Sequence, residues 1–257
     1  MTLDQTPDPS AGTQPPPEFS VVVPMKNEEG NVAFLVDAIA EACAGRPFET
    51  ILVNDGSEDG TAGVIRALQA DRPWLRLIEH ARSGGQSAAV HSGVHAARAP
   101  VICTLDGDGQ NPPAEIPKLV GPLLAKDAPA TLGLVAGQRV ARKDTASKRW
   151  ASTFANGLRA RMLHDDTRDT GCGLKAFRRD GFLELPFFNH MHRYLPALFS
   201  AYGWEVAHCD VSHAERHSGT SNYTNLHRAL VGIHDLFGVR WLIKRAKPVR
   251  PLPEERP

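Results

Sequence analysis

Short apolar segments alternate with amphipathic segments along the first hundred residues of the chain. Strands are predicted where branched apolar residues cluster between turn residues, and helices where apolar residues recur every three or four positions. The predicted strands are residues 19–23, 50–53, 74–78 and 101–105, and the predicted helices between them are residues 31–44, 61–68 and 87–97. We expect Pro24 to end the first strand. The alternation predicts βαβ units and therefore an α/β fold, with a mainly parallel central sheet flanked by helices.

The second half of the chain has a less regular pattern. It predicts strands at residues 132–136 and 204–210, helices at 147–163 and 192–202, and a glycine-rich strand-and-loop segment at 169–177. Right-handed crossovers bring the carboxyl ends of successive parallel strands to one edge of a sheet. The loops after the first four strands should therefore lie together. These loops are residues 24–30, 54–60, 80–86 and 106–113.

The two ends of the chain differ in composition from its centre. Residues 1–18 are rich in proline and poor in apolar side chains, and residues 248–257 are similar, so we expect both to be disordered. Between them we expect one α/β domain over residues 19–225 and an amphipathic helix over residues 226–247.

The helix predicted at residues 226–247 carries apolar residues on one face and basic residues near its end. The apolar positions are Leu226, Leu230, Ile233 and Phe237, extended by Leu236, Val239 and residues 241–243, and the basic positions after them are Lys244, Arg245, Lys247 and Arg250. Two interpretations stay open. The helix could lie in the surface of an anionic membrane, or it could pack on the core of the domain. Asp235 and Arg240 exclude a spanning helix.

Composition excludes several classes of protein. The chain has 257 residues, of which 42% are hydrophobic, so it can bury a sizeable core. Its 29 basic and 29 acidic residues cancel, which gives no indication of nucleic acid as a partner. The four cysteines are scattered without a CxxC pair, as is typical of a reducing compartment. Neither a signal peptide nor a spanning segment is predicted, so we expect a cytoplasmic protein that is soluble or peripheral.

Two acidic residues follow the fourth predicted strand in the segment Asp106-Gly107-Asp108-Gly109-Gln110. They could be turn residues, because Asp and Gly dominate turns. Ligands bind at the carboxyl edge of parallel sheets, however, and these carboxylates emerge there together. Hard oxygen donors suit Mg²⁺ or Mn²⁺, and such an ion neutralises a departing diphosphate. The segment therefore favours nucleotide-sugar chemistry.

Polar residues also follow the first three strands. Asp55 comes one residue after the second strand and is placed to bond a base or ribose, although residues 59–61 of the same loop read as a helix cap. Glu28 is either an acid in the first turn of a helix or a ligand of a ribose hydroxyl. Residues 83–87 lack the Walker lysine, and GxGxxG is missing after the first strand, so classical kinases and dehydrogenases are disfavoured.

Histidine is plentiful but does not indicate a zinc site. The 11 histidines include no HExxH spacing and only one HxH pair, at His190 and His192. His190 and His192 come nearest, and we interpret them as surface or loop residues.

Taken together, these segments resemble a known family. PMKNEEGNV, ILVNDGSEDGT, GGQSAAVHSGV and TLDGDGQNPP are similar to glycosyltransferase family 2, and most similar to its branch that glycosylates polyprenyl phosphates, the dolichol-phosphate mannose synthases and undecaprenyl-phosphate sugar transferases. VAGQR, RDTGCGLKAFRR, RYLP and the motif from His213 to Tyr223 support that branch. Three departures stand out: Tyr194 replaces a usual Phe, Asn222 replaces a frequent Lys, and the C-terminal transmembrane pair of many relatives is missing.

The resemblance implies a GT-A fold and a role for particular residues. The implied metal ligands for Mg²⁺ or Mn²⁺ are Asp106, Asp108 and Gln110. The implied nucleotide-sugar contacts are Pro24, Glu28, Asp55, Gln86, Asp106 and Arg216. The implied contacts of the acceptor phosphate are Arg139, Arg149 and Thr153, and the implied catalytic residues are Asp108, Arg139 and Arg193.

The function implied is a metal-dependent, inverting transfer of a hexose from GDP-mannose or a UDP-hexose to a polyprenyl monophosphate. The enzyme would then be peripheral on the cytoplasmic face of a membrane. Two alternatives stay open: a GT-A transferase with a sugar or protein hydroxyl as acceptor, and a non-catalytic protein that binds nucleotide sugars.

Overall fold

A computed structural model describes residues 15–140, 157, 159, 161–163, 165, 167–214 and 225–249; the side chains of residues 225–231 and 233 are not described. The two chain ends and most of the helix predicted at residues 147–163 therefore lie outside the described residues. So do three residues with predicted roles in the site, Arg149, Thr153 and Arg216.

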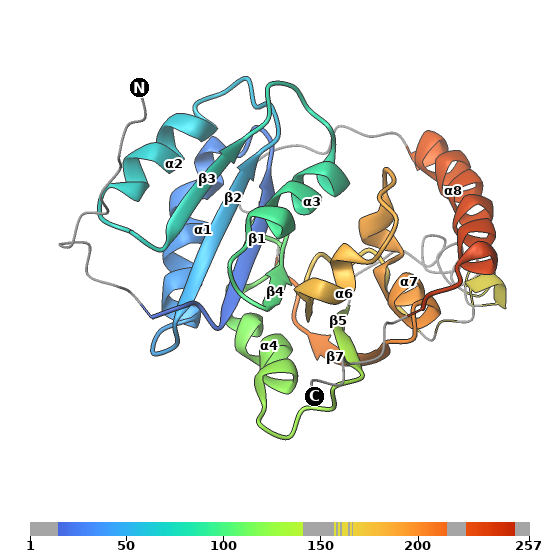
Figure 1. The fold of residues 1–257 in the computed structure, drawn as a ribbon. Coiled ribbons are helices and arrows are strands. Elements are labelled where there is room, and N and C mark those ends of the chain that lie inside the picture. Colours follow the sequence, from blue (N-terminus) through green and yellow to red (C-terminus); the bar gives the residue numbers. More distant parts are fainter. Residues whose placement is uncertain are drawn as a thin grey trace, which may run out of the picture.

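A seven-stranded sheet forms the centre of the molecule (Figure 1). Its order is β3-β2-β1-β4-β6-β5-β7, with β1 (Phe19–Met25), β2 (Phe48–Asn54), β3 (Leu75–Glu79), β4 (Val101–Thr104), β5 (Leu132–Arg139), β6 (Lys175–Arg178) and β7 (Glu205–Val211). The pairs among β1–β4 are parallel, as is β5 with β7, while β6 runs antiparallel to both β4 and β5. The predicted α/β fold with a mainly parallel sheet is confirmed, with β6 as its exception.

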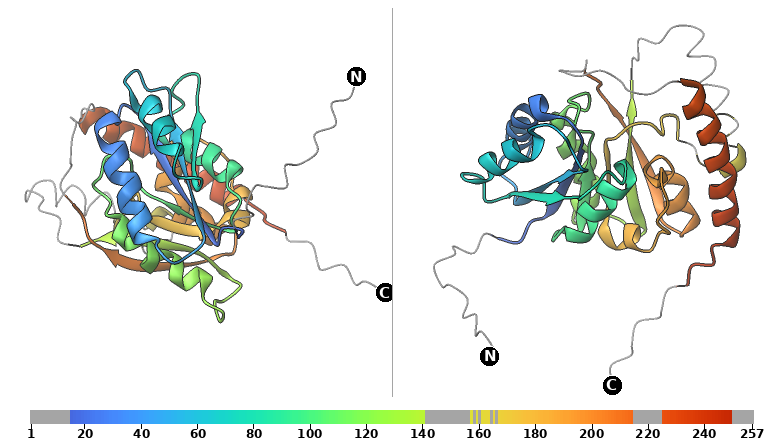
Figure 2. Two further views of the ribbon diagram at one scale, coloured as in Figure 1. Left: turned by 90° about the vertical axis from the view of Figure 1, so that its left-hand side faces the viewer. Right: turned by 90° about the horizontal axis from the view of Figure 1, so that it is seen from above.

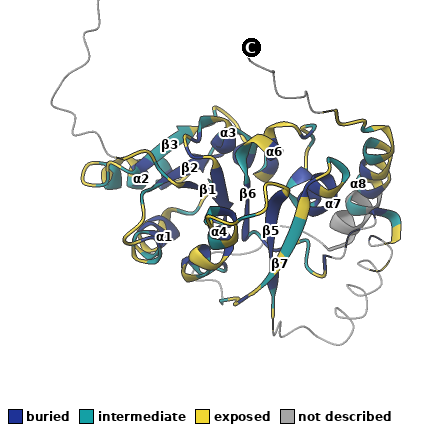
Figure 3. Cartoon of the chain, turned by 60° about the horizontal axis from the view of Figure 1, so that its bottom comes forward, coloured by how far each residue is buried: buried dark blue, intermediate teal, exposed yellow. Residues whose placement is uncertain are grey.

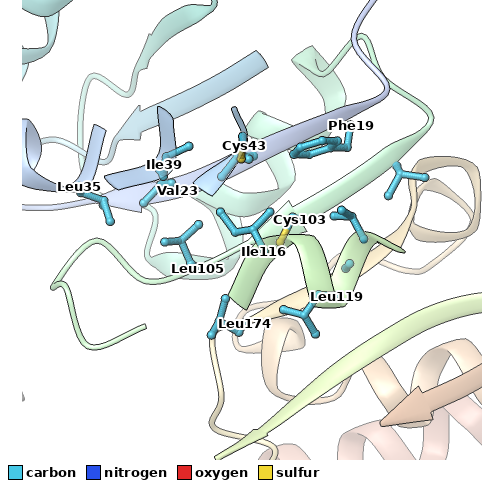
Figure 4. Packing of buried hydrophobic residues seen from close by; sticks show 14 of the residues in the cluster. Phe19, Val23, Leu35, Ile39, Cys43, Cys103, Leu105, Ile116, Leu119 and Leu174 are labelled. Carbon is cyan, nitrogen blue, oxygen red and sulfur yellow. The ribbon is translucent and has the colours of Figure 1, made fainter. Parts of the chain in front are cut away.

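Helices cover both faces of this sheet (Figures 1 and 3). They are α1 (Glu29–Ala42), α2 (Thr61–Gln69), α3 (Gln86–Ala96), α4 (Ile116–Leu124), α6 (Arg179–Leu183), α7 (Leu195–Ala201) and α8 (Asn225–Arg245), with short 3₁₀ turns η1 (Pro113–Glu115) and η2 (Met191–Arg193). Successive side chains of a strand point to opposite faces. Accordingly Val21 and Val23 join a core cluster with α1 and α4, whereas Val22 joins a second cluster with α3 and α7. Figure 4 shows part of the first cluster, to which Leu35 and Ile39 of α1 and Ile116 of α4 all belong.

Strand β1 continues through Pro24 to Met25, so the prediction that Pro24 ends it is wrong. The Met25 carbonyl accepts a hydrogen bond from the Asp55 amide, so Met25 faces β2. Neighbouring residues of a strand face opposite sides, which directs Pro24 toward β4. There the pairing of β1 has already ended, at Val22 with Thr104. The missing N–H of proline therefore costs no ladder bond.

Helix α8 lies at the opposite end of the molecule from α1 and α2 (Figures 1 and 2). Leu236 and Val239 of this helix are buried in the second core cluster. No helix within the described part of the chain has the length and hydrophobicity needed to span a bilayer.

Candidate active site

Hydrogen bonds join the loops at the carboxyl edge of the parallel strands. The Asn27 amide after β1 donates to Ser57 Oγ after β2 (2.9 Å), and the Glu28 amide donates to Thr61 Oγ1 (3.0 Å). Gln86, which follows the β3 loop, reaches Asp106 after β4. These contacts confirm the predicted convergence of the post-strand loops.

Asp106 lies at the centre of this edge. Gln86 Nε2 donates to its Oδ1 (2.6 Å), and Asn111 Nδ2 donates to its Oδ2 (2.9 Å). A Cβ on Gly173 would come within 2.4 Å of the Asp106 carboxylate, so a larger residue there would displace that carboxylate from its present position. Burial, followed by the neighbouring charge of Asp108, raises the pKa of the Asp106 carboxyl. The carboxylate is thus held in a fixed orientation next to a like charge.

Asp108 and Gln110 complete the acidic segment and also form its turn. The Gln110 amide donates to Asp108 Oδ1 (3.1 Å), so the turn interpretation of these residues holds as well. The described residues contain no cluster of three or more His, Cys, Asp or Glu side chains that could hold a metal by themselves. Two half-buried carboxylates and an amide fit a divalent cation whose remaining ligands come from a diphosphate and water. The raised pKa of Asp106 is consistent with that fit, because a cation would offset both the burial of this carboxylate and the repulsion between the two acids.

Glu28 and Asp55 both bond to their own chain. Glu28 Oε2 accepts from Asn31 Nδ2 (2.5 Å), so its carboxylate is oriented by the first turn of α1. Asp55 is buried and accepts four hydrogen bonds, from the His80 ring, Ser83 Oγ and two glycine amides. Contacts of Glu28 and Asp55 with a nucleotide stay predictions.

A cavity beside Asp106 brings together residues from both halves of the chain. Pro24, Gln86 and Asp106 line it from the first half, and Lys175 and His192 from the second. The position of His192 contradicts its interpretation as a surface or loop residue. Its Nδ1 is 2.7 Å from Ser87 Oγ on α3, and burial, with the charges of Lys175 and then Arg193, lowers its pKa well below 6.5.

Lys175 is a site residue that the sequence motifs did not identify. Its ammonium is buried in β6 and donates to the Cys172 carbonyl. Burial lowers its pKa, against the opposing effect of the nearby Cys172 and Asp106. The available signal was a charged residue within the otherwise apolar segment Gly173-Leu174-Lys175-Ala176-Phe177. For His192 no comparable signal exists in the sequence.

Arg139 lies at the end of β5 and forms a bidentate ion pair with Asp169. Its Nε and Nη2 donate to Oδ2 (2.5 Å) and Oδ1 (2.9 Å) of that carboxylate. This contact, which outweighs burial, raises the pKa of Arg139. Arg193 is half-buried in η2, directly after His192. The guanidinium of Arg139 is thus positioned by Asp169.

The fold and this site define a class of protein. The arrangement is a GT-A fold with paired acids after its fourth strand, and the model of the family described as "Glycosyl transferase family 2" matches residues 20–185. The chain belongs to this family.

Particular relatives support the assignment. The chain is 34% identical, over 96% of its length and 74% of the relative's, to dodecaprenyl-phosphate galacturonate synthase of Rhizobium johnstonii. It is 35% identical to undecaprenyl-phosphate 4-deoxy-4-formamido-L-arabinose transferase of Pectobacterium carotovorum, over 80% of this chain but only 63% of that protein. The fold also resembles glucosyl-3-phosphoglycerate synthase from Mycobacterium tuberculosis, solved with Mn²⁺, UDP-glucose and glycerol 3-phosphate. That match has a TM-score of 0.62 and 20% identity, and it covers 87% of this chain and 80% of that one.

Proposed function

We propose that the protein transfers a sugar from a nucleoside diphosphate sugar to a polyprenyl monophosphate. The observation that carries the proposal is the pair Asp106 and Asp108, fixed at the carboxyl edge of the sheet beside a cavity that both halves of the chain line. The relatives named for dodecaprenyl- and undecaprenyl-phosphate products support the acceptor class. The proposed donor is GDP-mannose or a UDP-hexose, and the group transferred is its hexose.

In the proposed reaction a phosphate oxygen of the acceptor attacks the anomeric carbon. The bond from that carbon to the diphosphate breaks, and the nucleoside diphosphate leaves with the electron pair. Mg²⁺ or Mn²⁺ held by Asp106, Asp108 and Gln110 would neutralise the charge on the leaving group. The acceptor phosphate is already ionised near neutral pH, so no strong general base is required. Orientation and charge then supply most of the rate enhancement.

The described residues of the site divide this work between them. Gln86 and Asn111 fix the Asp106 carboxylate. The buried ammonium of Lys175 places positive charge next to that acid. Asp169 occupies Nε and Nη2 of Arg139, so a phosphate would meet that guanidinium from its Nη1 side. Arg193 is proposed to approach the same anions, and Arg149, Thr153 and Arg216 to contact phosphates as the resemblance implies.

The test is transfer of radiolabel from nucleotide sugars to a polyprenyl phosphate in the presence of Mn²⁺. We expect labelled product in the organic extract, and a loss of at least about hundredfold in Asp108→Ala. Asp127→Ala, which removes an exposed acid outside the site, is the matched control and should retain full activity. Label that appears only in an aqueous product would indicate a hydroxyl acceptor. Tight donor binding without any transfer would indicate a sensor, and either outcome contradicts the proposal.

Helix α8 has one buried face and one exposed face. The exposed face is a candidate for contact with the membrane that holds the lipid acceptor. On the inner face Leu236 and Val239 are buried, and Asp235 Oδ2 lies 2.8 Å from His190 Nδ1. On the outer face Phe237 and Trp241 are 62% and 60% exposed. The interpretation that the helix packs on the core is therefore correct for its inner face. The outer face is not covered by any described residue of the chain.

We further propose that the outer face of α8 binds the surface of an anionic bilayer. The exposed residues between positions 234 and 247 are aromatic, small or basic, and none is acidic. The basic ones among them are Arg240, Lys244, Arg245 and Lys247. Aromatic side chains insert at the headgroup level, and basic side chains bind anionic lipids there. The proposed location is the cytoplasmic face, as a peripheral protein.

Flotation with lipid vesicles tests this surface. We expect binding to vesicles that contain phosphatidylglycerol and little binding to phosphatidylcholine alone. Replacing both Phe237 and Trp241 by Ser should weaken binding at least about tenfold. Phe187→Ser is the matched control, because Phe187 is 51% exposed but lies in the loop after α6. Equal binding by both variants would contradict the proposal.

A further inference from the structure

The short turn η2 carries two residues of the site and is bonded to α3 on one side. His192 lines the cavity beside Asp106, and Arg193 follows it directly. Ser87 Oγ on α3 accepts a hydrogen bond from the His192 amide (3.3 Å) and lies 2.7 Å from Nδ1 of the same ring. The first half of the chain therefore holds η2 at His192.

Helix α8 holds both ends of the same turn. Before the turn, Asp235 Oδ2 lies 2.8 Å from Nδ1 of His190. A carboxylate can only accept, so this nitrogen carries the proton. After the turn, the Tyr194 hydroxyl donates to the Gly232 carbonyl (3.3 Å). Burial and then the charge of Asp235 raise the pKa of Tyr194 to about 12, so its hydroxyl keeps the proton that it donates.

The Tyr194 hydroxyl gives a physical meaning to one departure from the family pattern. Phenylalanine is usual at this position in the segments that the chain resembles. It has the same ring but no donor for the Gly232 carbonyl. The bond from residue 194 to α8 is therefore a feature of this chain that the resemblance does not imply.

The backbone at His190 transmits the contact with α8 to Arg193. His190 has a positive φ of 67°, a conformation that is unfavourable for a residue with a Cβ. Its amide donates to Asn189 Oδ1 (2.9 Å), and its ring is held by Asp235. The His190 carbonyl in turn accepts from the Arg193 amide (3.1 Å). A shift of His190 would therefore move Arg193 through a single hydrogen bond.

The residues of α8 that hold η2 lie opposite its exposed aromatic residues. Successive residues of a helix are rotated by roughly 100°, so Gly232 and Asp235 share a face, whereas Phe237 and Trp241 lie on the other side. The helix whose outer face is proposed to bind lipid is thus the helix that holds η2.

We propose that Asp235 and Tyr194 are positioning residues that hold η2 against α8 and thereby keep His192 and Arg193 in the site. This inference rests on the proposed function for its kinetic consequence, because Arg193 is proposed to approach the reacting anions. Its structural consequence, a turn whose order depends on α8, is independent of that function. Neither Asp235 nor Tyr194 is proposed to contact a substrate.

The first test is the rate of sugar transfer to a polyprenyl phosphate. In Asp235→Ala the ring of His190 loses its acceptor, so kcat should fall about tenfold while KM for the nucleotide sugar changes less than about threefold. Asp235→Asn retains an oxygen that accepts from His190 and should recover most of that loss. Tyr194→Phe should lower kcat about threefold. Tyr202→Phe, at the far end of α7, is its matched control and should keep the wild-type rate.

Combination with Arg193→Ala tests whether the effect passes through η2. Arg193 is the residue of this turn with a proposed catalytic role. If Asp235 acts by placing Arg193, then Asp235→Ala should add less than about twofold to the loss seen in Arg193→Ala alone. A general loss of stability would instead add its full factor in either background.

Hydrogen exchange separates the inference from the proposed function. The amides of Arg193 and Tyr194 are bonded within the turn, so they should exchange faster in Asp235→Ala, whether or not any sugar is transferred. Glu205→Ala is the matched control, because Glu205 is also an acid that accepts a side-chain bond, from Thr131 at the start of β7. It should leave exchange in residues 190–194 unchanged.

Three results would overturn the inference. Wild-type exchange at Arg193 and Tyr194 in Asp235→Ala would show that η2 does not depend on α8. Losses from Asp235→Ala and Arg193→Ala that multiply in full would show that Asp235 does not act through Arg193. Equal exchange in Glu205→Ala and Asp235→Ala would indicate a general loss of stability. Absence of transfer in the wild type would contradict the proposed function and leave the exchange result to decide the role of Asp235.

Discussion

The two halves of the sheet are built differently. In residues 19–124 every strand pair is parallel, and short loops bond to one another at the carboxyl edge. In residues 132–245 the antiparallel strand β6 lies between β4 and β5, so its polar residues are placed against the first half. Thr104 Oγ1 bonds the Gly173 carbonyl (2.9 Å), and Ser87 bonds His192. The first half thus organises its own loops, whereas the second half contributes to the site through contacts across the sheet.

The largest expected effect comes from breaking the ion pair at the end of β5. Arg139→Ala removes a guanidinium proposed to meet the acceptor phosphate, so kcat/KM for the lipid should fall about hundredfold. Asp169→Asn keeps the guanidinium but weakens the bidentate contact that orients it, and about a tenfold loss is expected. Transfer assays over a range of acceptor concentrations measure both.

An exposed ion pair in the same half provides the control. Arg168 and Asp210 lie 2.9 Å apart, with side chains 73% and 57% exposed. Exposed pairs contribute little, so Arg168→Ala should change activity less than about twofold. If Arg139→Ala were as active as this control, Arg139 at the end of β5 would not contact the acceptor phosphate as proposed.

The same difference explains which features could be predicted from the sequence. The first four strands and their helices were predictable because each unit is local, and Asp106 and Asp108 follow a strand whose end the pattern marks. The continuation of β1 through Pro24 was not, because it depends on where β4 stops. His192 and Lys175 were not identified as site residues, since their burial depends on β6 and on Ser87, which lies far from His192 in sequence.

Helix α8 shows a further limit of periodicity. The pattern predicted an amphipathic helix and placed Phe237 on the apolar face, extended by Leu236 and Val239. In the structure Leu236 and Val239 are buried, whereas Phe237 is exposed. Periodicity identifies apolar positions but does not say which of them a neighbouring element covers.

Packing of α8 on the core should contribute measurably to the stability of the second half. Leu236→Ala should lower the free energy of unfolding by about 2–3 kcal/mol, because it leaves a cavity in the core cluster that α8 completes. Phe237→Ser, one residue along, should change it by less than about 0.5 kcal/mol. Urea unfolding of both variants gives the comparison. Equal values would show that α8 does not pack on the core as the structure has it.

The smallest expected effect concerns the junction between the halves at His192 and Ser87. The folded pKa of His192 is well below 6.5, so its contribution to stability is present above pH 6.5 and is lost as the pH falls below that value. His192→Asn can keep a bond to Ser87 but does not titrate. The slope of unfolding free energy against pH between 7 and 5 should therefore become shallower, by at most about 1.4 kcal/mol per pH unit. His234→Asn, which replaces an exposed histidine of α8, is the matched control. A wild-type slope in His192→Asn would mean that His192 is not held neutral in the folded protein, and its burial against Ser87 would then not contribute to the pH dependence of stability.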